Sequence, residues 1–447
     1  MLGAQATDAP AEGRLKRPTR GRHLPFPAVR YDGRVTSDAS LARRLGTGDA
    51  VVIGLGSMLG AGLFSAFAPA AAAAGPWLLA GLALAAVVAW ANASSSAQLA
   101  AQYPRSGGTY LYGRERLGEW PGFLAGWSFV VGKTASCAAM ALTVAAYAAP
   151  PGWERPVAVA AVAALVAVNA LGVTRTALAT RIILSVVLAV LVIAIVASAA
   201  GGAAPASSVD RPLDAYGVLQ SAGLLFFAFA GYARIATMGE EVRDPSRTLP
   251  RAILGALLLA VAIYAVVGVS LLAALGWQGL AASTQPLVDA AAAWPWTGPL
   301  IRVGAAAASL GALLALIAGI GRTSLAMARN GDLPRVLAHI DPVRSVPRRA
   351  EIALGVVVIV LVLVADLRSA IGFSSFGVLL YYLVANLSAL TQQAPHRRYP
   401  RAVAVVGAVG CVVLVVTLPP ESILVGLAVL AVGAGYRAIR LRVSARE

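Results

Sequence analysis

Long apolar stretches alternate with short polar segments along almost the whole chain. A helix needs about 17–25 apolar residues to cross the hydrocarbon of a bilayer, and twelve stretches reach or approach this length. Because little chain remains between them, the pattern predicts an all-α polytopic membrane protein with twelve transmembrane helices. The predicted spans are 48–67, 76–99, 121–149, 156–172, 182–200, 216–239, 252–276, 299–320, 351–365, 370–390, 402–418 and 422–436.

The composition agrees with a membrane protein. Of the 447 residues, 59% are hydrophobic and 13% are charged, whereas roughly a quarter of the residues in soluble domains are charged. Two cysteines, Cys137 and Cys411, fall inside predicted spans, and the three histidines, His23, His339 and His396, fall outside them. These positions offer no zinc site inside the membrane and no disulfide framework, so we expect no metal and no cofactor.

The net charge of +16 comes from basic residues on alternate loops. They precede the first span, from Arg14 to Arg44, and then follow every even-numbered span, while the other loops carry few. This alternation obeys the positive-inside rule. It predicts a multi-pass protein of the cytoplasmic (inner) membrane with both termini cytoplasmic, whose basic surface meets membrane lipid and not nucleic acid.

Two predicted spans contain glycine where a helix tolerates it poorly. The first reads GLGSMLGAGLF (54–64) and the sixth reads LLFFAFAGYARIATMGEE (224–241). Each opens a block of five spans and, because five is odd, the second block enters the membrane from the opposite side. Interrupted helices at matching positions of inverted repeats mark the binding sites of secondary transporters.

The chain therefore divides into five predicted segments. A polar N-terminal tail, rich in proline and arginine, is expected to be disordered and cytoplasmic. Two inverted repeats, two further helices and a cytoplasmic C-terminal tail follow it. The boundaries are 1–45 for the N-terminal tail, 46–200 and 215–390 for the repeats, 400–436 for the two helices and 437–447 for the C-terminal tail.

The two interrupted spans predict a binding site. Non-helical backbone is tolerated at membrane depth only where it lines a cavity or is buried in protein. Unwinding at Ser57–Gly62 would free N–H groups at the positive end of a half-helix, which attracts an anion. Carbonyls freed at Phe227–Ala230 would attract an ammonium, so an amino acid fits both ends. Alternatively, Gly60 and Gly62 form a face of small residues that packs against another helix.

Four segments resemble the amino acid–polyamine–organocation (APC) superfamily of permeases. They are GSMLGAGLF (56–64), YPRSGGTYLYGRERLG (103–118), FFAFAGYARIATMGEEVRDPSRTLPRAI (226–253) and GRTSLAMARNGDLP (321–334). The resemblance implies a 5+5 inverted repeat followed by two extra C-terminal helices, and secondary active transport of amino acids by alternating access.

The resemblance also implies which residues bind the substrate. Backbone amides of the first span would hold the carboxylate, and carbonyls of the sixth would hold the amine. The rings of Phe229 and Tyr232 would line the pocket or simply pack between helices. The predicted substrate site comprises Ser57, Met58, Leu59, Gly60, Ala61, Gly62, Phe227, Ala228, Phe229, Ala230, Gly231 and Tyr232.

Two departures from the family bear on substrate and coupling ion. Many members carry an acidic residue two positions after the glycine of the sixth helix, where this chain has Ala233. Without that carboxylate, neutral or apolar amino acids are favoured over cationic ones. Some proton-coupled relatives place a lysine in the fifth helix where others bind sodium, and the nearest position here is Val187. That lysine is therefore absent.

Four charged residues are candidates for coupling or gating. Lys133 lies roughly 18 Å into the third span, where it would carry the coupled proton, replace sodium as a fixed cation, or bind carbonyls of a broken helix in a purely structural role. Arg234 shares a helix face with Glu240, and Arg322 could partner Glu240 across helices. These three residues form an inner gate or are ordinary interfacial charges.

The predicted function is a proton-coupled amino acid symporter, with sodium left open as the coupling ion. A polyamine or organic-cation permease and a non-transporting amino acid sensor are the alternatives. The spans lack the groups of an enzyme active site, and the chain lacks the phosphate-binding loop of an ATP-driven pump. The sequence does not specify an oligomeric state.

Overall fold

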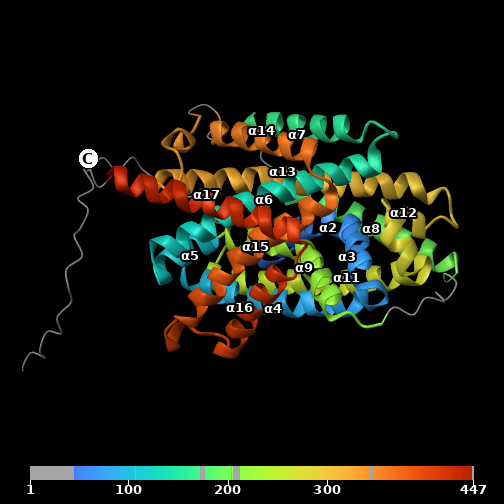
Figure 1. Ribbon diagram of the computed structural model, residues 1–447, viewed down its shortest axis with the longest axis horizontal. Coiled ribbons are helices and arrows are strands. Elements are labelled where there is room, and N and C mark those ends of the chain that lie inside the picture. Colours follow the sequence, from blue (N-terminus) through green and yellow to red (C-terminus); the bar gives the residue numbers. More distant parts are fainter. Residues whose placement is uncertain are drawn as a thin grey trace, which may run out of the picture. The chain divides into compact units, whose positions relative to one another are not determined.

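The computed structural model describes residues 45–105, 107–171, 177–202, 204, 212–341, 344 and 346–444. All of them belong to one unit of mutual contacts, Leu41–Glu447. The regular elements in this part of the chain are helices (Figure 1). The expected disordered tail, 1–45, lies outside the described residues except for Leu45.

The helices are distributed over both halves of the chain. In the first half they are α1 (Thr47–Met58), α2 (Ala61–Ser65), α3 (Phe67–Ala74), η1 (Gly75–Trp77), α4 (Leu78–Gln102), α5 (Gly108–Leu117), α6 (Glu119–Ala148), α7 (Glu154–Ala170) and α8 (Ala177–Ala200). In the second half they are α9 (Ala215–Phe229), η2 (Ala230–Tyr232), α10 (Ala233–Ala236), α11 (Pro245–Ala282), α12 (Pro286–Ala290), α13 (Thr297–Arg329), η3 (Arg335–Ala338), α14 (Arg348–Val364), α15 (Leu367–Leu390), η4 (Ala394–His396), α16 (Arg401–Val416) and α17 (Pro420–Ser444).

Every predicted span coincides with a helix, but not every helix is long enough to be counted as a membrane span. Among the described residues, nine helical segments have the length and apolar composition needed to cross a membrane. The helices α7, α14 and α16, with 17, 17 and 16 residues, are not among them. The protein is therefore an all-helical membrane protein, and twelve crossings remain a prediction.

The C-terminal end differs from the expected boundary. Helix α17 continues past the predicted end at 436 to Ser444, so most of the segment expected to be a tail is helical. Arg437, which was assigned to that tail, is only 4% exposed. The sequence pattern missed this extension because arginines replace apolar residues there, and a run of basic residues resembles the end of a span.

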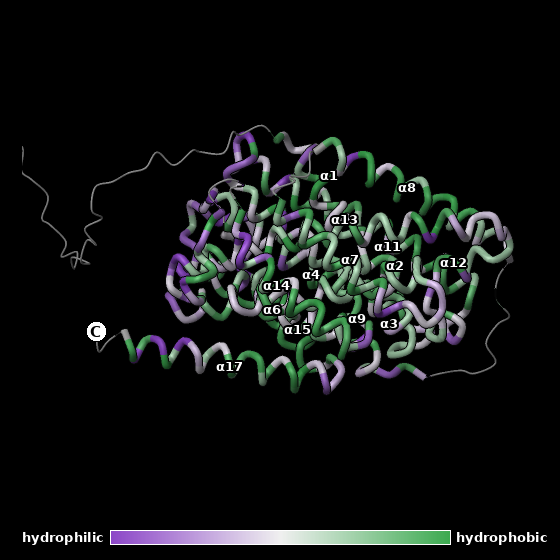
Figure 2. Tube along the Cα trace, turned by 90° about the horizontal axis from the view of Figure 1, so that it is seen from above, coloured by the Kyte–Doolittle hydropathy of each residue, from purple (hydrophilic) through white to green (hydrophobic). Residues whose placement is uncertain are grey.

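Helix α6 lies at the centre of the bundle and packs extensively against α13 and α15. At the crossing with α15, a Cβ added to Gly377 would lie 2.7 Å from the Cα of Gly132, so position 377 requires glycine. Helices α7 and α14 lie side by side along one side of the bundle, next to α13 (Figure 1). Figure 2 shows apolar chain through the body of the bundle and hydrophilic segments gathered mainly at one end.

A buried ion cluster surrounds Asp332, just after the end of α13. The Asp332 carboxylate is 4% exposed and accepts hydrogen bonds from the Tyr110 hydroxyl at 2.7 Å and the Arg114 Nη1 at 2.8 Å. It also pairs with Arg437, which reaches Glu119 at 3.1 Å. Burial raises the pKa of Tyr110 to about 12, so its phenol stays protonated and donates. The cluster joins α5, the end of α13 and the end of α17.

Removal of the central carboxylate is expected to destabilise the protein. Asp332→Ala leaves the buried Arg437 without one partner, which costs about 3–5 kcal/mol when a buried pair is broken. We expect a clear fall in the thermal midpoint of the detergent-solubilised protein. The midpoint is measured by size-exclusion chromatography of the protein after heating.

The matched control is Glu115→Ala at the same end of the bundle. It removes an exposed pair with Arg105 at 2.9 Å, and such surface pairs contribute about 0–1 kcal/mol. Equal midpoints for Asp332→Ala and Glu115→Ala would contradict a structural role for the cluster.

Candidate functional site

The first interrupted span breaks at two residues. Helix α1 ends at Met58, Gly60 has non-helical angles (φ −107°, ψ −140°), and α2 begins at Ala61. Only Leu59 and Gly60 leave the helix, so the break is narrower than the predicted Ser57–Gly62. The first N–H groups of a helix lack intrahelical acceptors, and no side chain caps α2. The amides of Ala61 and Gly62 are therefore the donors at this break.

The sixth predicted span breaks in a milder way. Helix α9 ends at Phe229, the chain tightens into the single 3₁₀ turn η2, and α10 ends only four residues later at Ala236. A 3₁₀ turn shifts the hydrogen-bond pattern without opening the chain. Consequently some carbonyls lose their usual α-helical donors here, although the backbone does not unwind fully.

The two breaks touch each other through their glycines. A Cβ added to Gly62 would lie 2.5 Å from the Cα of Ala228, and one added to Gly231 would lie 2.5 Å from the carbonyl oxygen of Ser57. A Cβ on Gly60 would lie 2.9 Å from Ala312. These contacts are those of a small-residue packing face, so the packing and binding interpretations apply to the same residues and do not exclude each other.

A tyrosine that the sequence pattern did not single out joins the two breaks. The hydroxyl of Tyr264 on α11 lies 2.8 Å from the carbonyl oxygen of Met58 and 2.9 Å from that of Ala228. Tyr264 is fully buried, and its ring packs edge-on against Phe229 at 5.0 Å between centroids. Its one hydroxyl proton can serve only one carbonyl at a time. Nothing in the apolar run around it distinguishes this tyrosine from a core residue.

The predicted coupling lysine reaches the second break. Lys133 on α6 is 4% exposed, and its Nζ donates to the carbonyl oxygen of Ala230 at 3.0 Å. Ala230 opens the 3₁₀ turn, so the lysine supplies a donor where the helix is interrupted. This is the contact expected of a structural lysine, and it also brings Lys133 to one of the predicted substrate-binding carbonyls.

The two predicted pocket rings are buried among other aromatic rings. Tyr232 stacks on Tyr382 of α15 at 4.9 Å with an interplanar angle of 28°, and Phe229 contacts Tyr264 as described above. Both Phe229 and Tyr232 are 0% exposed. In this conformation they therefore pack between helices.

The charged gating candidates lie on α10, on the segment after it and on α13. Arg234 donates to the Thr237 hydroxyl at 3.3 Å. The ion pair of Arg322 goes to Glu241 at 3.0 Å, whereas the sequence suggested the neighbouring Glu240. Leu45, just before α1, exchanges backbone hydrogen bonds with Glu241 and Arg243. The start of α1, the segment after α10 and the end of α13 are thus linked together.

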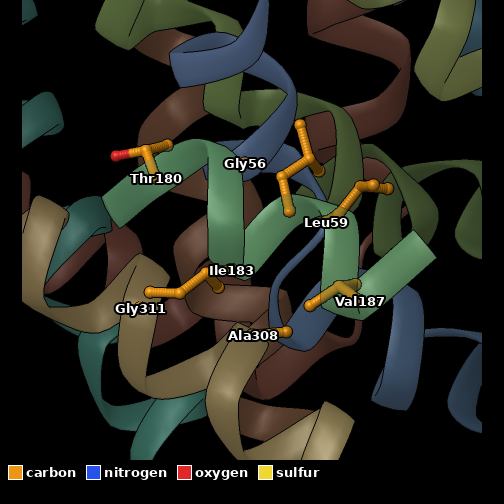
Figure 3. Close-up of a pocket in the computed structure, with 8 residues that line it drawn as sticks. Gly56, Leu59, Thr180, Ile183, Val187, Ala308 and Gly311 are labelled. Atoms are coloured by element: carbon orange, nitrogen blue, oxygen red, sulfur yellow. The ribbon is translucent and has the colours of Figure 1, made fainter. Parts of the chain in front are cut away.

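A small pocket lies between α1, α8 and α13 (Figure 3). Apart from the Thr180 hydroxyl, the side chains that line it are apolar. It includes Val187, the position nearest to the lysine or sodium site of some APC relatives. The lining residues are Gly56, Leu59, Thr180, Ile183, Leu184, Val187, Ala308 and Gly311. In the part of the chain that is described, no group of three or more His, Cys, Asp or Glu side chains could hold a metal ion.

Comparison with known proteins places the chain among transporters. The family model for amino acid permeases matches residues 45–433. An uncharacterized transporter of Mycobacterium tuberculosis is 57% identical over 91% of this chain and 93% of its own. Human cationic amino acid transporter 4 is 29% identical over 78% of this chain and 59% of its own. The branched-chain amino acid permease BcaP of Bacillus subtilis is 26% identical over 82% of this chain and 84% of its own.

The close contact between the breaks predicts that Gly62 tolerates no side chain. In Gly62→Ala the new methyl group would clash with the Ala228 backbone, and overpacking of this kind costs about 1–3 kcal/mol. We expect a lower thermal midpoint in detergent. Gly56→Ala on the same span is the control, because its Cβ would meet only Thr180 Cγ2 at 3.4 Å. A Gly62→Ala protein as stable as Gly56→Ala would contradict the close approach.

Proposed function

This chain belongs to the amino acid permease family and is a transporter, and we propose that it moves neutral or apolar amino acids across the cytoplasmic membrane by alternating access. The observation that carries the proposal is the juxtaposition of the two helix breaks. Amide donors at Ala61 and Gly62 lie against the segment that carries the Ala228 and Ala230 carbonyls. Together they offer complementary partners to a carboxylate and an ammonium.

The packing of the helices supports the proposed 5+5 inverted repeat. In this scheme α1–α2, α4, α6, α7 and α8 correspond to α9–α10, α11, α13, α14 and α15. Helix α1 contacts α11 as α9 contacts α4, and α6 contacts α15 as α13 contacts α8. Likewise, α6 contacts α7 and α14 as α13 contacts α14 and α7. If each helix is exchanged for its counterpart in the other set, these contacts therefore turn into one another. Helices α16 and α17 lie outside the repeat.

The proposed orientation, with both termini cytoplasmic, is supported by contacts among the arginine-rich segments. Asp49 at the start of α1 pairs with Arg181 at the start of α8, and Arg322 pairs with Glu241. Arg116 of α5 donates to Thr391 after α15. The positive-inside rule requires such segments to share one side of the membrane, and these contacts do gather them at one end.

The backbone is proposed to bind the part that all amino acids share. Amides at the start of α2 would hold the carboxylate, and the carbonyls of Phe227, Ala228 and Ala230 would hold the amine. Each carbonyl oxygen has two lone pairs, and in this conformation Ala228 and Ala230 already accept from Tyr264 and Lys133. Closed and substrate-bound conformations would thus differ in which donors these carbonyls accept from.

The proposed preference for neutral side chains depends on Ala233. This residue is buried, 2% exposed, at the start of α10, where many APC members carry a carboxylate. Similar proteins include both cationic and branched-chain amino acid transporters, so the family alone does not select a substrate. A polyamine permease would lack a partner for the α2 amides, and a sensor would bind an amino acid without moving it.

Proton coupling is proposed in preference to sodium coupling. A sodium ion is a hard cation that requires several oxygen ligands. The pocket between α1, α8 and α13, which contains Val187, offers one side-chain hydroxyl, that of Thr180 (Figure 3). Lys133 is a basic side chain that contacts a proposed substrate-binding carbonyl, so we assign it to the coupling path.

The transport proposal is tested with purified protein in proteoliposomes. We expect uptake of radiolabelled leucine that is accelerated by an inward-directed proton gradient and is independent of a sodium gradient. Excess isoleucine or valine should compete, whereas arginine and putrescine should not. Competition by putrescine alone would favour the polyamine permease. Binding of leucine without uptake under any gradient would favour the sensor.

The proposed inner gate predicts a charge-swap rescue. Opening towards the cytoplasm requires the Arg322–Glu241 pair to separate, and the pair must re-form when the gate closes. Glu241→Arg places two cations together and is expected to reduce the initial uptake rate strongly. Combining it with Arg322→Glu restores an opposite-charge pair and should recover part of that rate. If the double variant is as slow as the single one, the pair is not a gate element.

A further inference from the structure

The buried ammonium of Lys133 interacts with the backbone and not with a carboxylate. The residue is 4% exposed, and within the described residues no ion pair to it is found. Its hydrogen-bond acceptor is the carbonyl oxygen of Ala230 at 3.0 Å. A buried lysine is costly unless its charge is compensated. The dipole of a carbonyl released by a helix break provides part of that compensation.

The position of Lys133 is fixed by close packing around it. Gly132 lies so close to Gly377 of α15 that a Cβ on Gly377 would clash with it, and a Cβ on Gly132 would lie 3.1 Å from the Gly377 Cα. On the next turn, the Ser136 hydroxyl lies 2.6 Å from that of Ser374, which again joins α6 to α15. The base of the lysine is therefore held rigidly at this crossing, while its four-carbon chain reaches across to η2. The ammonium is the movable part.

The carbonyl that accepts from Lys133 is also one proposed to bind the amine of the substrate. We propose that the Lys133 ammonium occupies the amine subsite whenever no amino acid is bound, and that the substrate ammonium must displace it from the Ala230 carbonyl. This inference rests on the proposed function, because it requires that carbonyl to belong to the substrate site. Lys133 is then an intramolecular competitor that mimics the ligand.

Competition of this kind has a specific chemical signature. It affects only ligands that carry an amine, because the carboxylate binds at α2 on the other side of the contact between the breaks. It also weakens the apparent affinity for an amino acid, which equals the intrinsic affinity multiplied by the fraction of time that the subsite is free. If the lysine occupies the carbonyl about 90% of the time, its removal strengthens amino acid binding about tenfold.

Displacement would also connect substrate binding to the central helix. Two ammonium groups cannot share one carbonyl without repulsion, so a bound amine forces the lysine side chain away from η2. Lys133 belongs to α6, which packs against both α13 and α15. A change at the amine subsite is thereby transmitted to the helices around α6 without any further ligand.

The test compares two ligands in detergent-solubilised full-length protein by isothermal titration calorimetry. Leucine carries both charged groups, and 4-methylpentanoate is the same molecule without the amine. In Lys133→Met, which keeps the length and apolar stem but has no charge, we expect the Kd for leucine to fall by about tenfold. The Kd for 4-methylpentanoate should not change.

Two further variants separate competition from a general effect on the fold. Lys133→Arg retains a cation that can bind the Ala230 carbonyl, so leucine binding should not tighten. Thr134→Val alters the adjacent residue, whose hydroxyl donates to Val130 of its own helix and not to the break, and should leave both dissociation constants unchanged. The thermal midpoint of each variant establishes that the protein is folded.

Three outcomes would overturn the inference. Leucine binding that is unchanged or weaker in Lys133→Met, with wild type binding normally, assigns the lysine a structural role and leaves the proposed function intact. An equal fall in the Kd for 4-methylpentanoate in Lys133→Met indicates that the substitution has merely widened the pocket. If wild type neither binds nor transports leucine or any other amino acid, the proposed function falls, and the inference falls with it.

Discussion

The structure depends on one constraint, that backbone groups inside a hydrocarbon layer must find hydrogen-bond partners within the protein. Two helices of this chain break in the apolar interior, and each break releases amides or carbonyls. The breaks are possible because they are buried against each other and because side chains from α6 and α11 reach them. The Tyr264 hydroxyl lies within hydrogen-bond distance of the Met58 and Ala228 carbonyls and donates to one of them at a time, and Lys133 donates to that of Ala230.

This arrangement explains why the packing contacts and the proposed substrate-binding groups involve the same residues. Glycines at 62 and 231 allow the two interrupted segments to approach within van der Waals contact. The same approach brings amide donors and carbonyl acceptors to one place. A conventional pair of helices would have neither the close contact nor the exposed polar groups. In our proposal, the donors that these carbonyls have in this conformation are the groups with which a substrate amine competes.

At the hydrophilic end of the bundle, the segments are held together in a different way. There, charged side chains link segments far apart in the sequence, as when Asp332 joins α5 to α17 and Glu241 joins the segment after α10 to α13. The Asp332–Arg437 pair is buried, whereas Arg322 and Glu241 are partly exposed to solvent. Buried pairs are costly to break and exposed pairs are not. The buried pair of Asp332 therefore suits a fixed connection, and the exposed Arg322–Glu241 pair suits a contact that opens and closes.

The sequence alone determined the features that depend on local composition. In the described part of the chain, apolar runs located all nine helical segments that are long and apolar enough to cross a membrane, because that length is set by the bilayer. Glycines marked both interrupted spans, because helices disfavour them. Tertiary structure decided which groups meet. Nothing local distinguishes Tyr264 from a core aromatic, selects Ala230 as the acceptor for Lys133, or assigns Arg322 to Glu241 instead of Glu240. Nor does composition show that α17 continues to Ser444, since Arg437, the first arginine after the predicted end of the span, is paired with Asp332 and Glu119 from elsewhere in the chain. Such partners are fixed only when distant helices pack together.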